Sequence, residues 1–157
     1  MQLFNIRVYG ILIQDGALLV SDELIRGKQY TKFPGGGLEF GEGTRDCLKR
    51  EFREEMDLVV EVGEHLYTTD YYQPSAFHPD HQIISIYYFA KPLEAISIRI
   101  NQVPFEFDEA QLQAYRLQNE TESFRFIPLQ ELSEESVTLP IDKIVVRLIL
   151  DRFIHSS

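Results

Sequence analysis

Residues 36–58 read GGLEFGEGTRDCLKREFREEMDL and form the most informative segment of the chain. No glycine or proline interrupts residues 45–57, which predicts one continuous helix. Within it Leu48, Phe52 and Met56 recur every four residues. One stripe of the helix is therefore apolar and is expected to face a core.

Three glutamates mark another face of this helix. Glu51, Glu54 and Glu55 stand at i, i+3 and i+4, so we expect their carboxylates to share that face without a basic partner. Like charges at these spacings repel by roughly 0.2–0.5 kcal/mol per pair. A solvated, glutamate-rich surface is one interpretation. The glycine-rich residues 33–37 just before the helix favour another, a site for hard divalent cations, which prefer several oxygen ligands.

The spacing of the whole segment resembles the signature of the Nudix hydrolases. That signature is a glycine, five residues, a glutamate, seven residues and then R-E-U-x-E-E-x-G-U, where U is a bulky apolar residue. Gly36, Glu42 and residues 50–58 match it at every position except Asp57, which replaces the last glycine. At ordinary residue frequencies such a match arises by chance on the order of once in 10⁷ starting positions. The resemblance implies a hydrolase acting on acid anhydrides, which cleaves a diphosphate linkage with the help of a metal.

The resemblance also implies a ligand set for Mg²⁺ or Mn²⁺. Glu54 and Glu55 would be the main ligands, and Glu51 would be a further ligand or the general base. Gly36, or Gly35 before it, would offer a backbone carbonyl, because glycine lets the backbone approach metal and phosphate closely.

Further residues would support this set. In the family Arg50 supports the carboxylates from behind, and the alternative is a solvated arginine paired with Glu54. Glu42 is expected to bind the loop to the helix or to act as a more distant ligand. Outside the segment, Glu120 matches a family position for a metal ligand or catalytic base, with Glu122 as its near competitor and a solvated loop glutamate as the alternative.

The two ends of the helix carry their own signals. Thr44 is placed to cap the start, and Asp46 in the first turn suits the positive end of the helix dipole. At the other end, the family glycine allows a left-handed residue, a conformation that Asp57 tolerates less well.

Composition bounds the partners of the protein. The formal net charge of 157 residues is −10, which argues against duplex nucleic acid as a partner. The chain has one cysteine, Cys47, so no internal disulfide forms, and it has no apolar run long enough for a membrane helix.

His78 and His81 form an H-x-x-H pair that we interpret as loop residues near the pocket rather than zinc ligands, because further ligands are missing. We expect a cytoplasmic protein; its oligomeric state, a homodimer included, stays open.

Alternating and apolar runs predict the remaining elements. Strands are expected at residues 4–13, 17–20, 59–69, 83–90 and 124–127, with a hairpin at Asp15-Gly16, a short strand near 96–100 and a helix after Pro140. Residues 24–32 and 71–82 are expected to be loops, and residues 101–122 are ambiguous between strand and helix. The chain reads as a single α/β domain over residues 1–157. The resemblance implies an α/β/α sandwich with a mixed β-sheet.

Substrate residues are expected in the two loops. Arg26 and Lys28 lie in the first loop, and Tyr72 and Phe77 in the second could stack on a base, although aromatic residues there more often pack. Pro74 lies 16 residues after the segment, where ADP-ribose hydrolases of the family often carry proline. The sequence therefore favours a small-molecule nucleotide substrate, a nucleoside diphosphate linked to another moiety such as ADP-ribose or a nucleotide sugar. The alternatives are a pyrophosphohydrolase that removes damaging nucleoside triphosphates, and a Nudix-like binding or regulatory module without turnover.

Overall fold

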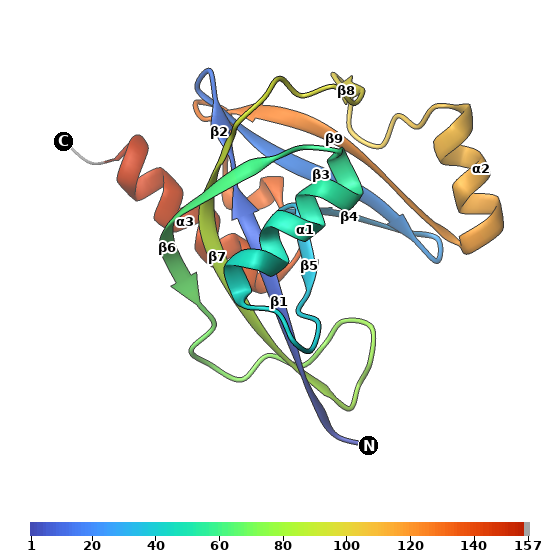
Figure 1. The fold of residues 1–157 in the computed structure, drawn as a ribbon, viewed down its shortest axis with the longest axis vertical. Coiled ribbons are helices and arrows are strands. Elements are labelled where there is room, and N and C mark those ends of the chain that lie inside the picture. The colour runs from blue at the N-terminus through green and yellow to red at the C-terminus, as the bar shows by residue number, and fades with distance from the viewer. Residues whose placement is uncertain (156–157) are drawn as a thin grey trace. The chain divides into compact units, whose positions relative to one another are not determined.

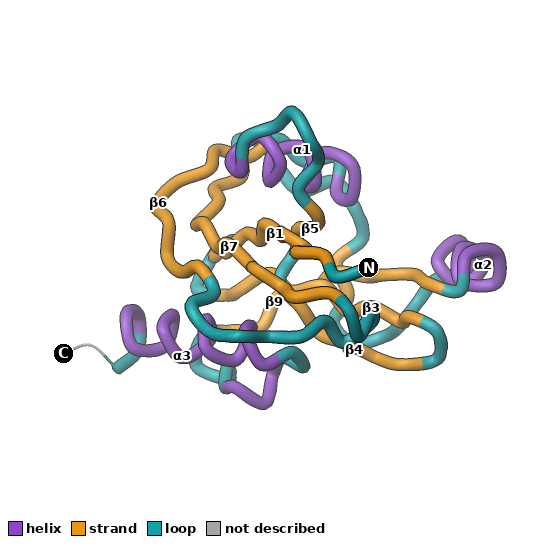
Figure 2. Tube along the Cα trace, turned by 90° about the horizontal axis from the view of Figure 1, so that it is seen from below, coloured by secondary structure: helices purple, strands orange, loops and turns teal. Residues whose placement is uncertain are grey.

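The computed structural model describes residues 1–155, and the chain divides into two compact units. The first unit comprises residues 1–12 and 34–97, and the second comprises residues 13–33 and 98–157. Figure 1 labels their elements along the chain, and Figure 2 distinguishes helices, strands and loops by colour.

The first unit is built on a four-stranded sheet with the order β5-β1-β7-β6. β1 (Leu3–Ile11) pairs in parallel with β7 (His81–Pro92). β5 (Gly35–Gly37) and β6 (Val60–Thr68) pair antiparallel with their neighbours, so the sheet is mixed. The strands expected at residues 59–69 and 83–90 are confirmed. The strand expected at residues 4–13 ends at Ile11, and the glycine-rich turn contains the short strand β5.

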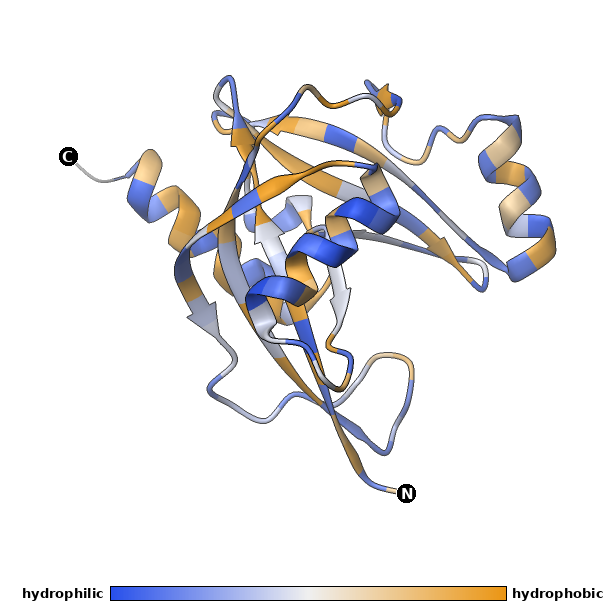
Figure 3. Ribbon diagram, in the orientation of Figure 1, coloured by the Kyte–Doolittle hydropathy of each residue, from blue (hydrophilic) through white to orange (hydrophobic). Residues whose placement is uncertain are grey.

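The helix of this unit, α1 (Thr44–Met56), packs next to β1, β5 and β6. Leu48, Phe52 and Met56 are buried, which confirms the apolar stripe, and Figure 3 shows it as orange bands on a mostly hydrophilic helix. Gly10 of β1 permits this close packing, because a Cβ there would lie 2.5 Å from the ring of Phe52.

The start of α1 differs from expectation. The N-cap residue is Gly43 and no side chain caps the helix, so the prediction that Thr44 is the cap is wrong. Thr44 is instead the first helical residue, and its hydroxyl hydrogen-bonds the hydroxyl of Tyr88 on β7 at 2.7 Å. Asp46 does lie in the first turn, as expected.

The end of α1 is left-handed at Asp57, with φ 48° and ψ 43°. This is the conformation that the family glycine implies, so aspartate occupies a strained position there. Its backbone N–H donates to the carbonyl of Arg53 at 3.1 Å, and the N–H of Leu58 donates to that of Phe52 at 3.3 Å. These bonds satisfy two of the last carbonyls of the helix.

Asp57→Gly is expected to stabilise the protein by roughly 0.5 kcal/mol and to leave activity nearly unchanged. Glycine removes the strain and a negative charge at the negative helix end, but it loosens the unfolded chain and gives up an exposed ion pair with Arg53 at 3.7 Å. Denaturant unfolding measures the change in the free energy of unfolding. Asp57→Asn distinguishes the effect of the charge from the effect of backbone strain, because asparagine removes the charge and keeps the side-chain shape. A clearly less stable glycine variant would show that the aspartate side chain contributes more than its geometry indicates.

The second unit is built on another mixed sheet, whose main order is β2-β3-β9-β8, with β4 also paired to β3. Its strands are β2 (Ile13–Gln14), β3 (Ala17–Ile25), β4 (Lys28–Lys32), β8 (Ile100–Asn101) and β9 (Glu120–Pro128). Its helices are α2 (Glu109–Gln118), the 3₁₀ helix η1 (Glu134–Ser136) and α3 (Pro140–Phe153). The α/β class is confirmed, with two mixed sheets where the resemblance implied one.

Two local predictions need correction in this unit. Residues 24–32 are not a loop: β3 continues to Ile25, a tight turn follows at Arg26-Gly27, and β4 returns. Both turn residues have positive φ, 49° and 81°, and arginine gives no signal for such a turn. The strand near residues 96–100 shrinks to Ile100–Asn101 of β8. The hairpin at Asp15-Gly16 is confirmed.

Residues 101–122, which the sequence left ambiguous between strand and helix, contain the helix α2. Asp108 forms a reciprocal capping box with Gln111, so residues 109–118 are helical rather than extended. The expected C-terminal helix is confirmed as α3, which starts at Pro140 and buries Ile141, Val145 and Ile149. In residues 1–155, no helix is long and apolar enough to cross a membrane.

Candidate active site

The three glycines of β5 lie against different neighbours. Gly36 pairs with Val8 and is turned toward α1, where a Cβ would come within 2.6 Å of the carboxylate of Glu51. Gly35 has a φ of 146° and pairs with Tyr9, and a Cβ there would overlap the carbonyl of Val8. Glycine is thus required at Gly35, and at Gly36 it allows a carboxylate to lie directly on the strand.

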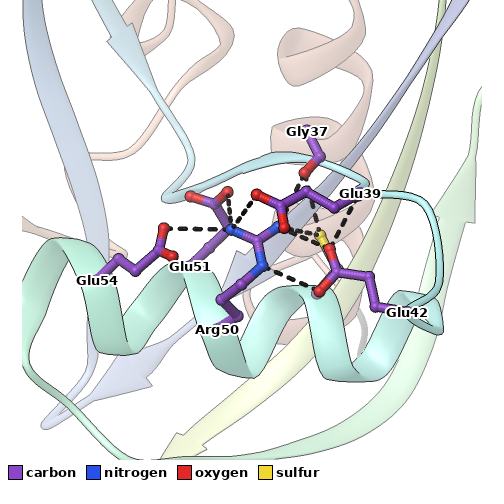
Figure 4. A network of polar contacts seen from close by, with 7 residues as sticks. Gly37, Glu39, Glu42, Arg50, Glu51 and Glu54 are labelled. Atoms are coloured by element: carbon purple, nitrogen blue, oxygen red, sulfur yellow. Dashed lines mark hydrogen bonds and ion pairs between the residues drawn. The ribbon is translucent and has the colours of Figure 1, made fainter.

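Arg50 organises the charged side of α1, as Figure 4 shows. Its side chain is 21% exposed, and its guanidinium is surrounded by acceptors. They are Glu42 Oε1 at 2.6 Å, Glu42 Oε2 at 2.9 Å, Glu51 Oε1 at 3.0 Å, the Gly37 carbonyl at 3.1 Å, Glu54 Oε2 at 3.2 Å and Glu39 Oε1 at 3.5 Å. The expectation that the carboxylates have no basic partner is wrong, because the long Arg50 side chain reaches acceptors on both the helix and the preceding loop.

Glu42 joins the loop to the helix, which is one of the two roles predicted for it from the sequence, the other being a more distant metal ligand. It accepts from the backbone N–H of Glu39 at 2.9 Å and from two nitrogens of Arg50. The hydrogen bond from Arg50 is the main reason why the pKa of Glu42 falls to about 2. The same bond raises the pKa of Arg50 above its already high value, so this pair stays ionised at any ordinary pH.

Cys47 lies beneath this network, fully buried. Burial first, and then the nearby Glu42 carboxylate, raise the pKa of its thiol to about 12. The thiol is therefore protonated at neutral pH and is a poor nucleophile or metal ligand. The rings of His78 and His81 lie against each other with centroids 4.6 Å apart and a tilt of 36°. The described part of the chain contains no cluster of three His, Cys, Asp or Glu side chains arranged to hold a metal ion.

The donors beside β5 nevertheless fit a hard divalent cation in kind. Glu51 and Glu54 offer carboxylate oxygens, with side chains 12% and 58% exposed, and Glu55 is half-buried. Arg50 engages one oxygen of Glu51 and one of Glu54, so the second oxygen of each is not used by this arginine. Oxygen-only donors next to a glycine strand are the set that Mg²⁺ or Mn²⁺ prefers.

Three other predicted residues meet in the second unit. Ile25 pairs with Lys28 on one side and with Glu120 on the other, and the N–H of Arg26 donates to the carbonyl of Asn119 at 2.9 Å. Arg26, Lys28 and Glu120 therefore lie together at one end of that sheet. Glu122, the alternative to Glu120 in the sequence analysis, lies further along β9. Its carboxylate accepts a hydrogen bond from the Ser21 hydroxyl at 3.3 Å.

The predicted aromatic loop lies between β6 and β7. The Ser75 hydroxyl accepts from the backbone N–H groups of Phe77 and His78, which makes this loop a defined turn. Pro74 forms an isolated bridge with Gln82 at the start of β7. Tyr72 is 67% exposed and lines an open cavity of about 360 Å³ together with the first residues of β1 and β7. Tyr72 is thus exposed enough to stack on a base, which is one of the two roles that the sequence suggested for it, the other being packing.

Arg7 is a residue near the glycine strand that the sequence did not single out. It pairs with Gly37, and its Nη1 lies 3.7 Å from the position that a Cβ on Gly37 would take. Its charge within the alternating polar and apolar residues of β1 was the only signal of it in the sequence.

The chain matches known proteins in its sequence family and in its fold. A family model described as NUDIX domain matches residues 3–148. The E. coli ORF135 protein is 16% identical and aligns over 99% of this chain and 94% of its own, with a TM-score of 0.69. The MutT protein from Methanosarcina mazei Go1 is 14% identical over 96% and 95% of the two chains, with a TM-score of 0.65. An ADP-ribose pyrophosphatase from Streptococcus suis 89-1591 is 15% identical over 98% and 94%, with a TM-score of 0.58. A search of curated proteins found no match.

Proposed function

The chain belongs to the Nudix family of pyrophosphohydrolases, and we propose that it hydrolyses the diphosphate bond of a nucleoside diphosphate linked to another moiety. The observation that carries this proposal is the acidic face of α1. Glu51 lies directly on Gly36, and Arg50 connects Glu51 and Glu54 to the loop that follows β5. Carboxylates held beside a strand without side chains suit a cation that must also reach phosphate oxygens.

The residues of this face have distinct roles in the proposed reaction. Glu54 and Glu55 would hold Mg²⁺ or Mn²⁺, with Glu51 and the Gly36 carbonyl as further ligands. When bound, such a cation neutralises charge on the diphosphate and lowers the pKa of the attacking water. A carboxylate that takes the proton of that water adds roughly 10²–10⁴-fold to the rate. Glu51 and Glu55 of this face are the candidates for this base, and the role of Glu120 as base or ligand remains a prediction of the sequence.

Arg50 is a positioning residue in this scheme. Its bonds to Glu51 Oε1 and Glu54 Oε2 orient both carboxylates, and its bonds to Glu42 anchor it to the loop. A cation at this point also limits the repulsion among the glutamates, which otherwise opposes their common placement.

We favour ADP-ribose or a nucleotide sugar as the substrate. Pro74, the exposed Tyr72 and Phe77 support this choice, and the fold is shared with a protein named ADP-ribose pyrophosphatase. Cleavage of nucleoside triphosphates is the second candidate, because the same fold occurs in a MutT protein. A cytoplasmic location and a single domain over residues 1–157 remain predictions of the sequence.

A panel of nucleoside diphosphate derivatives and nucleoside triphosphates tests the proposal. With Mg²⁺ or Mn²⁺ present, kcat/KM for ADP-ribose or a nucleotide sugar is expected to exceed that for every triphosphate, measured by released nucleotide and phosphate. Excess chelator serves as the blank for each compound. A triphosphate that surpassed all the diphosphate derivatives would reverse the order of the two candidates. Specific binding without turnover of any compound would favour a non-catalytic module.

A further inference from the structure

Arg7 lies on the face of β1 that is turned away from α1. Directly paired residues of antiparallel strands share one face of a sheet. Val8 and Gly36 form such a pair on the α1 side, because a Cβ on Gly36 would meet Glu51. The neighbouring pair, Arg7 and Gly37, must therefore project to the other side.

The guanidinium of Arg7 is held by an aromatic support. Its Nε donates to the hydroxyl of Tyr9 at 2.6 Å, and its central carbon lies 5.7 Å from the centroid of the same ring. Tyr9 is 4% exposed and packs against the fully buried Tyr87, with ring centroids 5.4 Å apart. This support limits the rotamers of Arg7 and keeps the half-buried charge in a less polar surrounding, where it attracts anions more strongly.

The glycine strand thus has opposite charges on its two faces. The Glu51 carboxylate lies on Gly36, and the Nη1 of Arg7 lies 3.7 Å from where a Cβ on Gly37 would be. Consecutive Cα atoms are about 3.8 Å apart, so both charges border the same short stretch of backbone. β5 is also the edge strand of its sheet, so no strand of that sheet covers its outer side.

We propose that Arg7 is a substrate-binding residue that holds a phosphate of the diphosphate against β5, with Tyr9 as its positioning residue. This inference rests on the proposed function. The net charge of the protein is −10, so a fixed guanidinium adds an attraction for a diphosphate that the rest of the chain does not favour, and an arginine fork matches phosphate geometry in a bidentate way. The absence of side chains on β5 leaves room for a phosphate to reach both the backbone and the guanidinium.

Binding without catalysis is the first arm of the test. Inorganic pyrophosphate and ADP are titrated into the full chain with excess chelator, by calorimetry or by NMR shifts. Arg7→Met is expected to weaken binding of both about 10- to 100-fold, and Arg7→Lys, which keeps the charge but not the fork, by an intermediate amount. Tyr9→Phe should weaken it a few-fold. Arg116→Met removes an equal charge from exposed α2 and should change nothing.

Steady-state kinetics with Mg²⁺ form the second arm. Arg7→Met is expected to raise KM at least about tenfold and to change kcat much less, whereas a purely structural role would lower the melting temperature and kcat with KM unchanged. The inference is overturned if the wild type binds neither ligand in chelator, if Arg7→Met binds both as well as the wild type, or if Arg116→Met loses as much. A different outcome is a wild type that binds pyrophosphate and ADP in a way that depends on Arg7 and yet hydrolyses no compound. That result would reject the proposed function and support Arg7 as an anion-binding residue.

Discussion

Glu54→Gln and Glu55→Gln are each expected to lower kcat on the order of 10³-fold while the protein stays folded. Each change removes one negative charge from the acidic face of α1 and keeps the side-chain volume. A cation that bridges diphosphate oxygens then loses a charged ligand. Steady-state kinetics on the best diphosphate substrate, at saturating Mg²⁺ or Mn²⁺, measures the effect.

The stability of the same variants separates ligation from folding. Removing a like charge at i, i+3 or i+4 relieves roughly 0.2–0.5 kcal/mol of repulsion per pair. Glu54→Gln also gives up the exposed Arg50 pair at 3.2 Å, so the melting temperatures should stay near that of the wild type. Glu109→Gln, an exposed glutamate of α2, is the charge-matched control for kcat. Near-normal turnover in both Glu54→Gln and Glu55→Gln would show that these two residues are not the main ligands.

Arg50→Met is expected to lower the melting temperature on the order of 5–10 °C and kcat/KM at least about tenfold. It leaves Glu42 and Glu51 without the cation that holds them, and their side chains are only 15% and 12% exposed. Arg50→Lys should restore part of the stability but should not restore the orientation of the carboxylates. An ammonium group has a single nitrogen and cannot donate to both oxygens of Glu42 as the guanidinium does with two nitrogens. A normal melting temperature in the methionine variant would mean that this network contributes little.

The pH dependence of unfolding gives Arg50→Met a second readout. In the folded protein the pKa of Glu42 lies at about 2, below its ordinary 4.5. The stabilisation from this shift is therefore complete above pH 4.5 and is lost as the pH falls toward 2. Without Arg50 the pKa should return toward 4.5, so the loss of stability over this range becomes shallower. Glu42→Gln, and the double variant in a mutant cycle, assign the change to this pair; an unchanged slope in Arg50→Met would contradict it.

Local spacing made the helix of the site and its acidic face predictable. Leu48, Phe52 and Met56 share one side of α1 because a helix repeats every 3.6 residues, wherever the rest of the chain lies. For the same reason Glu51, Glu54 and Glu55 occur together on another side. The left-handed end at Asp57 followed from the family glycine that it replaces. The prediction that Thr44 caps the helix was wrong, because the Thr44 hydroxyl hydrogen-bonds Tyr88, which lies 44 residues further along the chain.

Contacts between segments distant in sequence followed from the folding of the whole chain. Arg50 could have paired with Glu54 alone, but the return of the loop brought Glu42, Glu39 and the Gly37 carbonyl to it as well. Arg7 reached the glycine strand because β1 and β5 pair in a register that sets it opposite Gly37, and a shift by one residue would have turned it to the helix side. Which groups the helix presents on each side could thus be read from the residue spacing alone, since helical periodicity is local. The partners and orientation of those groups depended on strand register and loop closure, which local patterns do not encode.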